Sequence, residues 1–559
     1  MAFLRFDQVS FAYPDAKRRA LDRISFSMEE GEYVAVCGQS GCGKTTLLRQ
    51  AKPELVPAGA KEGQIFYQGI PLSELDRETS AMRIGFVQQN PDNQIVTDLV
   101  WHELAFGLEN MALPTPVIRR RVSGMASFFG MEGWFRQKTE GLSGGQKQML
   151  NLASIMVMDP KLLILDEPAS MLDPLAARNL LQMVHRINRE LGVAVLLCEH
   201  RLEEVFQAAD RVLLLEKGRI LADHTPAALA QSLRKNPESS RIYYGLPGAV
   251  RIFGELEQKG LYPEDRELPL SIRDARRELK KAVPEAYEKT ADGVSACFCP
   301  SGGRRKKEAP VLVGSELWFR YEEKGKDILR GLDMELYRGE ILALMGGNGT
   351  GKSTLLKILS GIQKPLRGRV KPAGGVRTAM LPQSPQALFI HDTLLEDLTD
   401  SASGDVRKAM AVADRLELSE KITSHPYDLS GGEMQRAAIG KLFLQEADIM
   451  LLDEPTKGLD AYLKRELAML LRRLAAEGTA FLIVTHDLEY AASYTDRCAL
   501  LFDGRITSSD EPHAFFAGNR FYTTAAGLIA GDVFQGAITC EEVVKACVSV
   551  KKAGKRAAG

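Results

Sequence analysis

One long pattern of motifs occurs twice in this chain, in the same order, and this repeat constrains the fold more than any other feature. The segment GEYVAVCGQSGCGKTTLLR at 31–49 returns as GEILALMGGNGTGKSTLLK at 339–357. Three shorter pairs follow: LSGGQ (142–146) and LSGGE (429–433), LLILDEP (162–168) and IMLLDEP (449–455), and CEHRLEE (198–204) and THDLEYA (485–491). A repeat this long excludes a solenoid, whose units have about 20 to 50 residues. We therefore predict two copies of one domain in tandem.

The spacing of the motifs indicates where the two copies differ. From the serine of LSGG to the aspartate that ends the apolar run is 23 positions in each copy (143 to 166, 430 to 453). From the lysine of the glycine-rich motif to that serine is 99 positions in the first copy (44 to 143) and 78 in the second (352 to 430). Of the missing 21 positions, 14 lie before the glutamine at 89 or 383, and 7 lie after it. We expect shared chemistry and different structures between the motifs.

The motifs place the two domains at 1–230 and 311–535, with a linker at 231–310 and a basic tail at 536–559. Frequent prolines exclude one long coiled-coil arm in the linker, although its charged stretch 272–282 has a helical pattern. The tail is expected to be frayed. The basic cluster at 304–307 is expected to be solvated.

Composition excludes several classes of protein. Lys and Arg number 72 against 73 Asp and Glu, a net charge of -1 that argues against a protein whose main task is wrapping nucleic acid. No apolar run reaches the roughly 18 residues of a membrane span, and the charged start does not resemble an export signal. Eight scattered cysteines favour reduced thiols in the cytoplasm; the pair Cys297 and Cys299 leaves free thiols or a metal site open.

Both glycine-rich motifs are P-loops, each between a strand-like apolar run and a segment suited to a helix. The glycines let backbone N–H groups face phosphates, the lysine reaches the β- and γ-phosphates, and the Thr or Ser hydroxyl binds Mg²⁺. The predicted nucleotide-binding residues are Gly38, Gln39, Ser40, Gly41, Cys42, Gly43, Lys44, Thr45 and Thr46, and Gly346, Gly347, Asn348, Gly349, Thr350, Gly351, Lys352, Ser353 and Thr354.

Two apolar runs each end in a pair of carboxylates. Asp166 and Asp453 have the position of a Walker-B aspartate, which completes Mg²⁺ coordination at the end of a buried parallel strand. The next residues, Glu167 and Glu454, could orient or deprotonate the attacking water. A charged residue at a strand end is the alternative, and the nearby P-loops argue against it.

The LSGG motifs narrow the class, because a serine and two glycines that open a helix supply a second set of N–H donors for an anion. With them the chain resembles the ATP-binding cassette (ABC) ATPases over everything but linker and tail. The resemblance implies an α/β fold of two tandem P-loop NTPase domains, each with a RecA-like core, an antiparallel β subdomain and a helical signature subdomain. It also assigns the adenine-stacking Tyr13 and Tyr321, the Q-loop Gln89 and Gln383 (also Mg²⁺ ligands), the switch His200 and His486, and the D-loop Asp173 and Asp460.

In that family two cassettes meet head to tail, so each signature closes the other cassette's site. The resemblance implies that Ser430, Gly431 and Gly432 close the first site, and that Ser143, Gly144 and Gly145 close the second. With Glu167, His200, Glu454 and His486 as catalytic residues, neither site lacks a catalytic residue type, and we predict two hydrolytic sites for ATP with Mg²⁺. Two departures are PASMLD at 168–173 and Glu199, which stands where threonine is commoner.

The segments after the Q-loop glutamines resemble the ATPases of energy-coupling factor (ECF) transporters: IGFVQQNPDNQIVTDLVWHELAFGLEN at 84–110 and LPQSPQALFIHDTLLEDL at 381–398. This resemblance implies a peripheral motor at the cytoplasmic face of the cell membrane. An integral membrane coupling subunit and a substrate-binding membrane subunit would import a vitamin, a vitamin precursor or a transition-metal ion. The alternative is a soluble ABC-F-like ATPase acting on ribosomes, which would have a long basic helical arm and Asn-His before the D-loop Leu-Asp.

Overall fold

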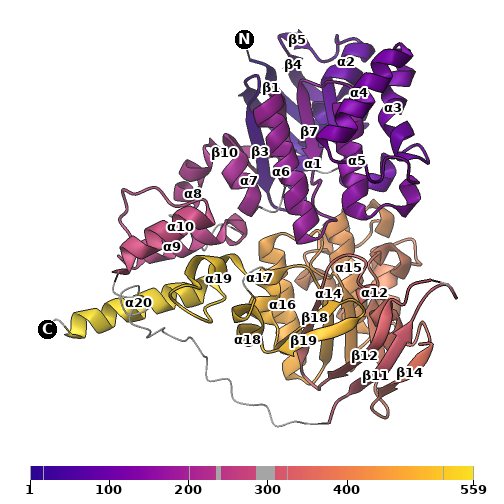
Figure 1. The fold of residues 1–559 in the computed structure, drawn as a ribbon, viewed down its shortest axis with the longest axis vertical. Coiled ribbons are helices and arrows are strands. Elements are labelled where there is room, and N and C mark those ends of the chain that lie inside the picture. Colours follow the sequence, from indigo (N-terminus) through magenta and orange to yellow (C-terminus); the bar gives the residue numbers. More distant parts are fainter. Residues whose placement is uncertain are drawn as a thin grey trace. The chain divides into compact units, whose positions relative to one another are not determined.

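Two compact units, Met1–Pro247 and Gly248–Gly559, make up the computed structural model, and each contains one copy of the motif repeat (Figure 1). The structure describes residues 2–14, 16, 18–199, 202–234, 241–284, 309–323, 325–519 and 522–557. His200, Cys297, Cys299 and the basic cluster 304–307 lie outside the described residues. None of the described helices combines the length and the apolar character that crossing a bilayer requires.

Each unit is built around a six-stranded sheet with the same strand order. The first runs β10 (Arg219–His224), β9 (Arg211–Glu216), β3 (Tyr33–Gly38), β8 (Ala194–Cys198), β7 (Leu162–Asp166), β6 (Ile84–Val87). The second runs, from its other end, β19 (Arg505–Asp510), β18 (Arg497–Phe502), β13 (Ile341–Met345), β17 (Ala480–Val484), β16 (Ile449–Asp453), β15 (Thr378–Leu381). All neighbours are parallel except β9 with β10 and β18 with β19.

The central strands of these sheets are buried along their whole length, as parallel strands covered on both faces must be. This explains why the sequence shows continuous apolar runs there. The helices that accompany the sheets are α1 (Lys44–Gln50), α6 (Pro174–Leu191), α7 (Leu202–Ala208) and α8 (Pro226–Arg234), and α12 (Lys352–Leu359), α16 (Ala461–Ala476), α17 (Leu488–Tyr494) and α18 (Pro512–Ala517). The tandem α/β architecture that the sequence predicts is confirmed.

Each unit also contains a smaller antiparallel sheet beside its core sheet. This region explains why the first copy is 14 residues longer between the P-loop lysine and the Q-loop glutamine. In the first unit it has four strands, β2 (Leu21–Met28), β1 (Leu4–Ala12), β4 (Ala60–Tyr67) and β5 (Ile70–Pro71), and helix α2 (Arg77–Arg83) follows. In the described part of the second unit it has three strands, β12 (Leu329–Leu336), β11 (Leu312–Phe319) and β14 (Arg367–Pro372). The extra strand and helix occupy the region where the first copy has 14 additional residues.

A helical subdomain between the Q-loop and the next core strand accounts for the remaining seven residues of the length difference. It consists of α3 (Val100–Asn110), α4 (Thr115–Phe128) and α5 (Gly144–Met156) in the first unit, and of α13 (Leu394–Ser401), α14 (Val406–Arg415) and α15 (Gly431–Leu444) in the second. The first two helices have 11 and 14 residues in the first unit, against 8 and 10 in the second. The seven residues missing after the glutamine are therefore lost from these two helices.

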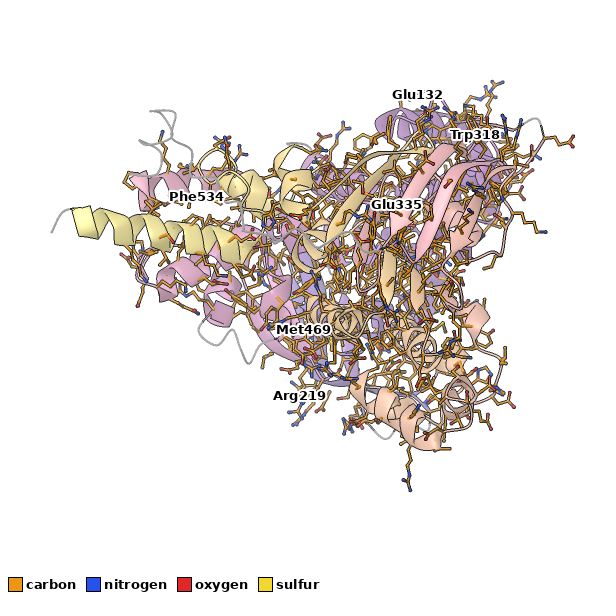
Figure 2. All side chains as sticks on the ribbon, turned by 90° about the horizontal axis from the view of Figure 1, so that it is seen from below. Glu132, Arg219, Trp318, Glu335, Met469 and Phe534 are labelled. Atoms are coloured by element: carbon orange, nitrogen blue, oxygen red, sulfur yellow. The ribbon has the colours of Figure 1, made fainter. Side chains whose placement is uncertain are left out.

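Helices from the expected linker pack against helices near the C-terminus, within the second unit. The four helices are α9 (Gly248–Gln258), α10 (Ile272–Ala282), α19 (Ala525–Ala530) and α20 (Cys540–Ala557). Helix α9 contacts α19 and α20, and α10 contacts α19. Phe534, which follows α19, is 1 % exposed, and Figure 2 shows it among these helices.

The C-terminal residues form helix α20, which differs from the frayed tail that the basic sequence predicts. Val543, Val544 and Cys547 are almost fully buried. Arg251 of α9 also donates to Glu541 of α20 at 2.9 Å. Burial of this apolar face compensates for the conformational entropy lost when the tail becomes ordered.

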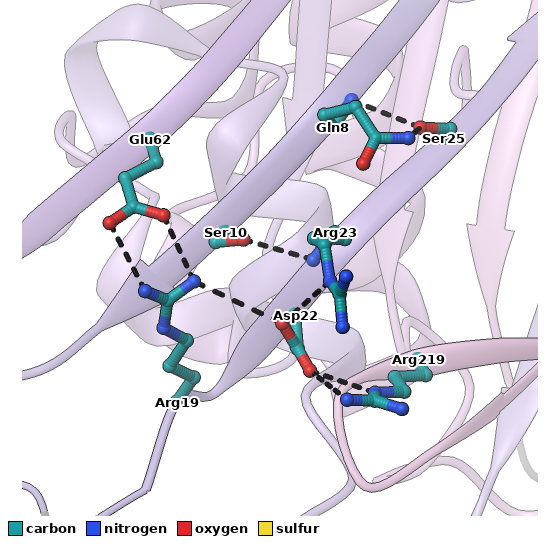
Figure 3. A network of polar contacts seen from close by, with 8 residues as sticks. All are labelled: Gln8, Ser10, Arg19, Asp22, Arg23, Ser25, Glu62 and Arg219. Carbon is teal, nitrogen blue, oxygen red and sulfur yellow. Dashed lines mark hydrogen bonds and ion pairs between the residues drawn. The ribbon is translucent and has the colours of Figure 1, made fainter.

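A network of hydrogen bonds and ion pairs connects the antiparallel sheet of the first unit to its core sheet (Figure 3). Asp22 of β2 accepts from the Arg219 guanidinium at 2.5 Å and 2.8 Å, and this bond lowers the pKa of Asp22. The Asp22 amide donates to the Gly218 carbonyl at 2.8 Å, and the Gly218 amide donates to the Cys42 carbonyl of the P-loop at 3.0 Å. The network thus positions one side of the P-loop.

Candidate functional site

Each P-loop follows the central strand of its sheet and ends where a helix begins. Gly43 and Gly351 stand immediately before α1 and α12, with φ of 105° and 102°. A Cβ atom on Gly43 would lie 2.5 Å from the Ala20 carbonyl oxygen, and one on Gly351 would lie 2.7 Å from the Ile328 side chain. Glycine is therefore required at both positions by conformation and by space.

The two P-loop lysines have the same conformation. Lys44 Nζ donates to the carbonyls of Gly38 at 3.0 Å and Gln39 at 2.8 Å. Lys352 Nζ donates to the equivalent carbonyls of Gly346 and Gly347 at 2.9 and 2.7 Å. Both ammonium groups therefore lie across the loop, where phosphates held by its N–H groups would meet them.

A hydroxyl and a carboxylate meet beside each P-loop and fit an Mg²⁺ ion. Thr45 Oγ1 donates to Asp166 Oδ1 at 3.0 Å, and Ser353 hydrogen-bonds Asp453. Burial, with the charge of Glu167 second, raises the pKa of Asp166 to about 6; burial also raises the pKa of Asp453. A buried carboxylate that is costly to ionise beside a hydroxyl is the oxygen donor set that Mg²⁺ prefers, and bound Mg²⁺ would favour the ionised form.

The glutamates that follow these aspartates share a strained backbone. Glu167 and Glu454 have φ of 46° and 52°, in the left-handed region that glutamate rarely adopts. Each amide donates to the end of the neighbouring strand at 3.0 Å, to the Cys198 and Val484 carbonyls respectively. Strain of this kind persists only where surrounding contacts hold it, so both cassettes maintain the same backbone conformation at this glutamate.

The side chain of each glutamate contacts another residue that the sequence assigns to its site. In the first unit Gln89 Nε2 donates to Glu167 Oε2 at 3.0 Å, so the structure brings together two residues that the sequence predicts for one site. In the second unit Glu454 Oε1 lies 3.3 Å from His486 Nε2, while Gln383 is exposed. Burial, followed by the charge of Asp453, raises the pKa of Glu454 to about 7, a value suited to exchanging a proton with water near neutral pH.

The signature serines open helices, as the sequence predicts. Ser143 and Ser430 cap α5 and α15, and each forms a reciprocal capping box, with Gln146 and Glu433 respectively. Their glycines occupy the first helical turn, where backbone N–H groups have no partner within the helix. The D-loop aspartates, Asp173 and Asp460, likewise cap α6 and α16.

The tyrosines assigned to adenine stacking lie next to the P-loop helices. The Tyr13 hydroxyl is 3.0 Å from Thr46 Oγ1, and the Tyr321 hydroxyl is 3.1 Å from Thr354 Oγ1. The rings are 39 % and 57 % exposed, so each presents aromatic surface to solvent beside its P-loop.

Contacts between the Q-loop segment and the signature helix differ between the units. In the first, Lys147 of α5 pairs with Asp92 at 2.6 Å, and Asn151 donates to the Pro91 carbonyl at 3.0 Å. In the second, Lys441 of α15 donates to the Leu388 carbonyl at 2.6 Å and also to Asp397 of α13 at 2.5 Å. The Lys441 and Asp397 side chains are 7 % and 0 % exposed, and the sequence does not predict their pairing.

The sequence contained one signal of that buried pair. Lys441 lies between Gly440 and Leu442 in a helix that is otherwise apolar for several residues, so a charged residue there needs an internal partner. Its partner lies 44 positions away, on another helix, and only the fold identifies it.

Comparison with known proteins identifies the family. The model of the ABC transporter family matches residues 21–170 and 329–457, which contain both P-loops. A Bacillus anthracis protein provisionally named as an ABC transporter ATP-binding protein is 39 % identical over 563 residues, covering 98 % of each chain. The chain belongs to the ABC transporter ATP-binding proteins. It therefore binds ATP with Mg²⁺ and hydrolyses ATP, and the ABC ATPase resemblance is confirmed.

A further relative and a solved structure each match nearly all of this ABC protein. A Bacillus subtilis protein, provisionally named as an HMP/thiamine import ATP-binding protein, is 30 % identical over 537 residues. The match covers 92 % of this chain and 92 % of that protein. An archaeal ribosome recycling factor has a TM-score of 0.56 at 20 % identity, over 91 % of this chain and 92 % of its own. At that identity the likeness shows the shared fold of two cassettes.

Proposed function

We propose that this ABC protein is the motor of an ECF-type importer and drives uptake of a micronutrient through separate membrane subunits. The observation that carries the proposal is an exposed apolar residue at the same place in each cassette. Val96 is 67 % exposed and Ile390 is 74 % exposed, and both lie between the Q-loop glutamine and the next helix. Exposed apolar side chains beside a nucleotide-sensing loop are suited to binding a partner.

The way these residues are held supports the proposal. The amides of Val96 and Thr97 donate to Glu103 Oε2 at 3.0 and 2.7 Å. The Ile390 amide donates in the same way to Asp397 at 3.2 Å. A buried carboxylate of the following helix therefore fixes each exposed residue, whereas the helices differ in length. Two similar anchors on unlike helices are what two different docking segments would require.

The relative named for HMP/thiamine import adds support, since it matches across almost the whole chain. On this proposal the protein lies at the cytoplasmic face of the cell membrane and binds an integral membrane coupling subunit and a substrate-binding membrane subunit. The substrate class is a vitamin, a vitamin precursor or a transition-metal ion.

Site-specific photo-crosslinking tests this assignment in the full chain. A photoreactive residue at position 96 or 390 should crosslink to integral membrane proteins in native membranes. The matched controls are Leu221 and Phe502, which are 64 % and 65 % exposed on the core sheets and should not give these products. Crosslinks to ribosomal proteins from positions 96 and 390 would support the ABC-F-like alternative and overturn the importer proposal.

The nucleotide sites are proposed to be composite, as the family resemblance implies. Ser430, Gly431 and Gly432 would close the first site, and Ser143, Gly144 and Gly145 the second. To shift the cassettes from almost wholly open to almost wholly closed, bound nucleotide must favour closure by about 5.5 kcal/mol, or about 2.7 kcal/mol for each of two ATP. Hydrolysis would then remove the γ-phosphate and reopen the pair.

Measuring ATP hydrolysis at one site while the other is silenced tests this arrangement. With Glu167→Gln silencing the first site, Ser143→Arg should abolish the remaining hydrolysis, because Ser143 would contact nucleotide in the second site. With Glu454→Gln silencing the second, Ser143→Arg should have a much smaller effect. The opposite pattern would assign each signature to its own cassette and contradict the composite sites.

A further inference from the structure

A buried glutamate in the first cassette makes a contact that no motif explains. Glu199 directly follows β8 and is 2 % exposed. Its Oε1 atom accepts a hydrogen bond from the Ala169 amide at 2.8 Å. Ala169 lies in the segment 168–172, which connects Glu167 to the D-loop aspartate.

This bond adds a second attachment between the end of β8 and the segment around Glu167. The Glu167 amide already donates to the Cys198 carbonyl at 3.0 Å. Cys198 therefore accepts from the amide of residue 167, and Glu199 accepts from the amide of residue 169. Because the Glu167 backbone is in the left-handed region, it depends on such contacts to keep its conformation.

The second cassette has the first attachment but a different residue at the position of the second. The Glu454 amide donates to the Val484 carbonyl at 3.0 Å, as in the first cassette. The residue that follows Val484 is Thr485, whose hydroxyl accepts from the Asp487 amide at 3.0 Å, within its own loop. A threonine side chain is also two heavy atoms shorter toward the D-loop segment than a glutamate.

We propose that Glu199 is a positioning residue for ATP hydrolysis in the first cassette. Its carboxylate holds the Ala169 amide and thereby keeps Glu167 oriented toward Gln89 and the attacking water. The glutamate side chain places an acceptor oxygen within hydrogen-bond distance of the Ala169 amide, which the shorter threonine side chain would not reach. The inference rests on the proposed catalytic role of Glu167.

The test measures the first site alone, in full-length protein that carries Glu454→Gln. Glu199→Thr, which introduces the residue of the second cassette, should lower kcat about tenfold or more and leave the KM for ATP within about twofold. The P-loop and Tyr13 contacts that bind nucleotide are unaffected by this change. Glu199→Gln retains an acceptor oxygen of the same reach and should recover most of the lost rate. Glu190→Thr, at an exposed ion pair of α6, is the matched control and should not alter either constant.

Wild-type kcat in Glu199→Thr would overturn the proposal. So would an equal loss in Glu199→Gln and Glu199→Thr, which would assign the effect to charge and not to the bond. If Glu199→Thr does not fold, Glu199→Asp replaces it, because its carboxylate is one methylene too short and the same loss is expected. Amide exchange at Ala169 should be faster in the variants that lose rate, and unchanged exchange would contradict the proposed bond. Glu167→Gln in the same background separates the two hypotheses: if it keeps full activity, the role of Glu167 is wrong, irrespective of Glu199.

Discussion

The two cassettes place the same nucleotide-binding groups in the same way and hold them with different contacts. The P-loop lysines donate to equivalent carbonyls, and Glu167 and Glu454 share a left-handed backbone. Other contacts are not shared: Lys147 of the first signature helix pairs with the exposed Asp92, whereas Lys441 of the second pairs with the buried Asp397. The chemistry of ATP therefore constrains the groups that face the nucleotide, while several solutions exist for holding them.

The same lesson applies to the attachment of the antiparallel sheet. In the first cassette an acidic residue on β2, Asp22, pairs with Arg219 beside the turn between β9 and β10. In the second the charges are reversed, because Arg330 on β12 pairs with Asp503 in the equivalent turn at 2.7 Å. The ion pair has kept its place while its polarity has changed.

Loss of the Mg²⁺ ligands should have the largest effect, and it should be equal in the two cassettes. Asp166→Ala and Asp453→Ala should each lower turnover at their own site at least about a hundredfold, because a bound metal ion contributes several kcal/mol to the transition state. ATP turnover is measured with the other site silenced, and chelation of Mg²⁺ in the wild type should stop both. A variant that keeps half its rate would show that the cassettes use metal differently.

The buried ion pair of the second cassette should give the next largest effect. Lys441→Met leaves Asp397 without its cation, so the second unit should lose about 3 to 5 kcal/mol of unfolding free energy. The equivalent residue in the first cassette is Ser154, which donates to the Asn151 carbonyl, and Ser154→Ala should cost about 1 kcal/mol. Calorimetry measures the loss of unfolding free energy in each variant, and hydrogen exchange shows which of the two units is destabilised.

A second variant checks the reason for that difference. Lys441→Met combined with Asp397→Asn removes both charges, keeps an acceptor oxygen for the Ile390 amide, and should recover much of the lost stability. No recovery in the double variant would mean that packing, and not the unpaired charge, causes the loss.

Removing the tyrosine rings should have a smaller and again symmetrical effect. Tyr13→Ala and Tyr321→Ala should raise the KM for ATP at their own sites about tenfold, since stacking on a base contributes about 1 to 3 kcal/mol. Tyr→Phe at either position loses only the bond to Thr46 or Thr354 and should behave almost as wild type. If the Phe variants lose as much as the Ala variants, the hydroxyl and not the ring is the functional group.

The C-terminal helices should show the smallest effect, visible as a dependence on pH. Burial alone would raise the pKa of Glu542, but bonds from His513 and from the Ile538 and Thr539 amides lower it below the ordinary value of 4.5. A lowered pKa in the folded state adds stability above the unfolded pKa and loses it as the pH falls through the folded value. Glu542→Gln should therefore destabilise the protein at pH 7, and the difference from the wild type should shrink as the pH falls below 4.5 and through the lowered folded pKa. A difference that is independent of pH would contradict this.

The sequence predicts the repeated parts well, because each depends on local pattern. Strands β7 and β16 follow from apolar runs, and the P-loop conformation follows from glycines that no other residue could replace at Gly43 and Gly351. The charged pattern at 272–282 predicts helix α10, whose bounds agree. The difference of 21 residues predicts two unlike regions, which the structure assigns to β5, α2 and shorter helices.

Features that depend on distant partners are not predicted. The basic tail is predicted to be frayed, because the sequence does not show that α9 and α19 contact α20. The sequence likewise does not show the contacts of Glu199, which it marks only as a departure, or of Lys441, whose partner lies on another helix. Local pattern shows that such residues are unusual, and tertiary contact decides what they do.

The claim that both cassettes hydrolyse ATP is tested most directly by three catalytic variants in the full chain. Steady-state ATP turnover is measured for Glu167→Gln, for Glu454→Gln and for both together. Each single variant should fall well below the wild-type rate, and the double variant should retain less than about 1 %. A wild-type rate in either single variant would show that the cassette concerned does not hydrolyse ATP, and would contradict the account.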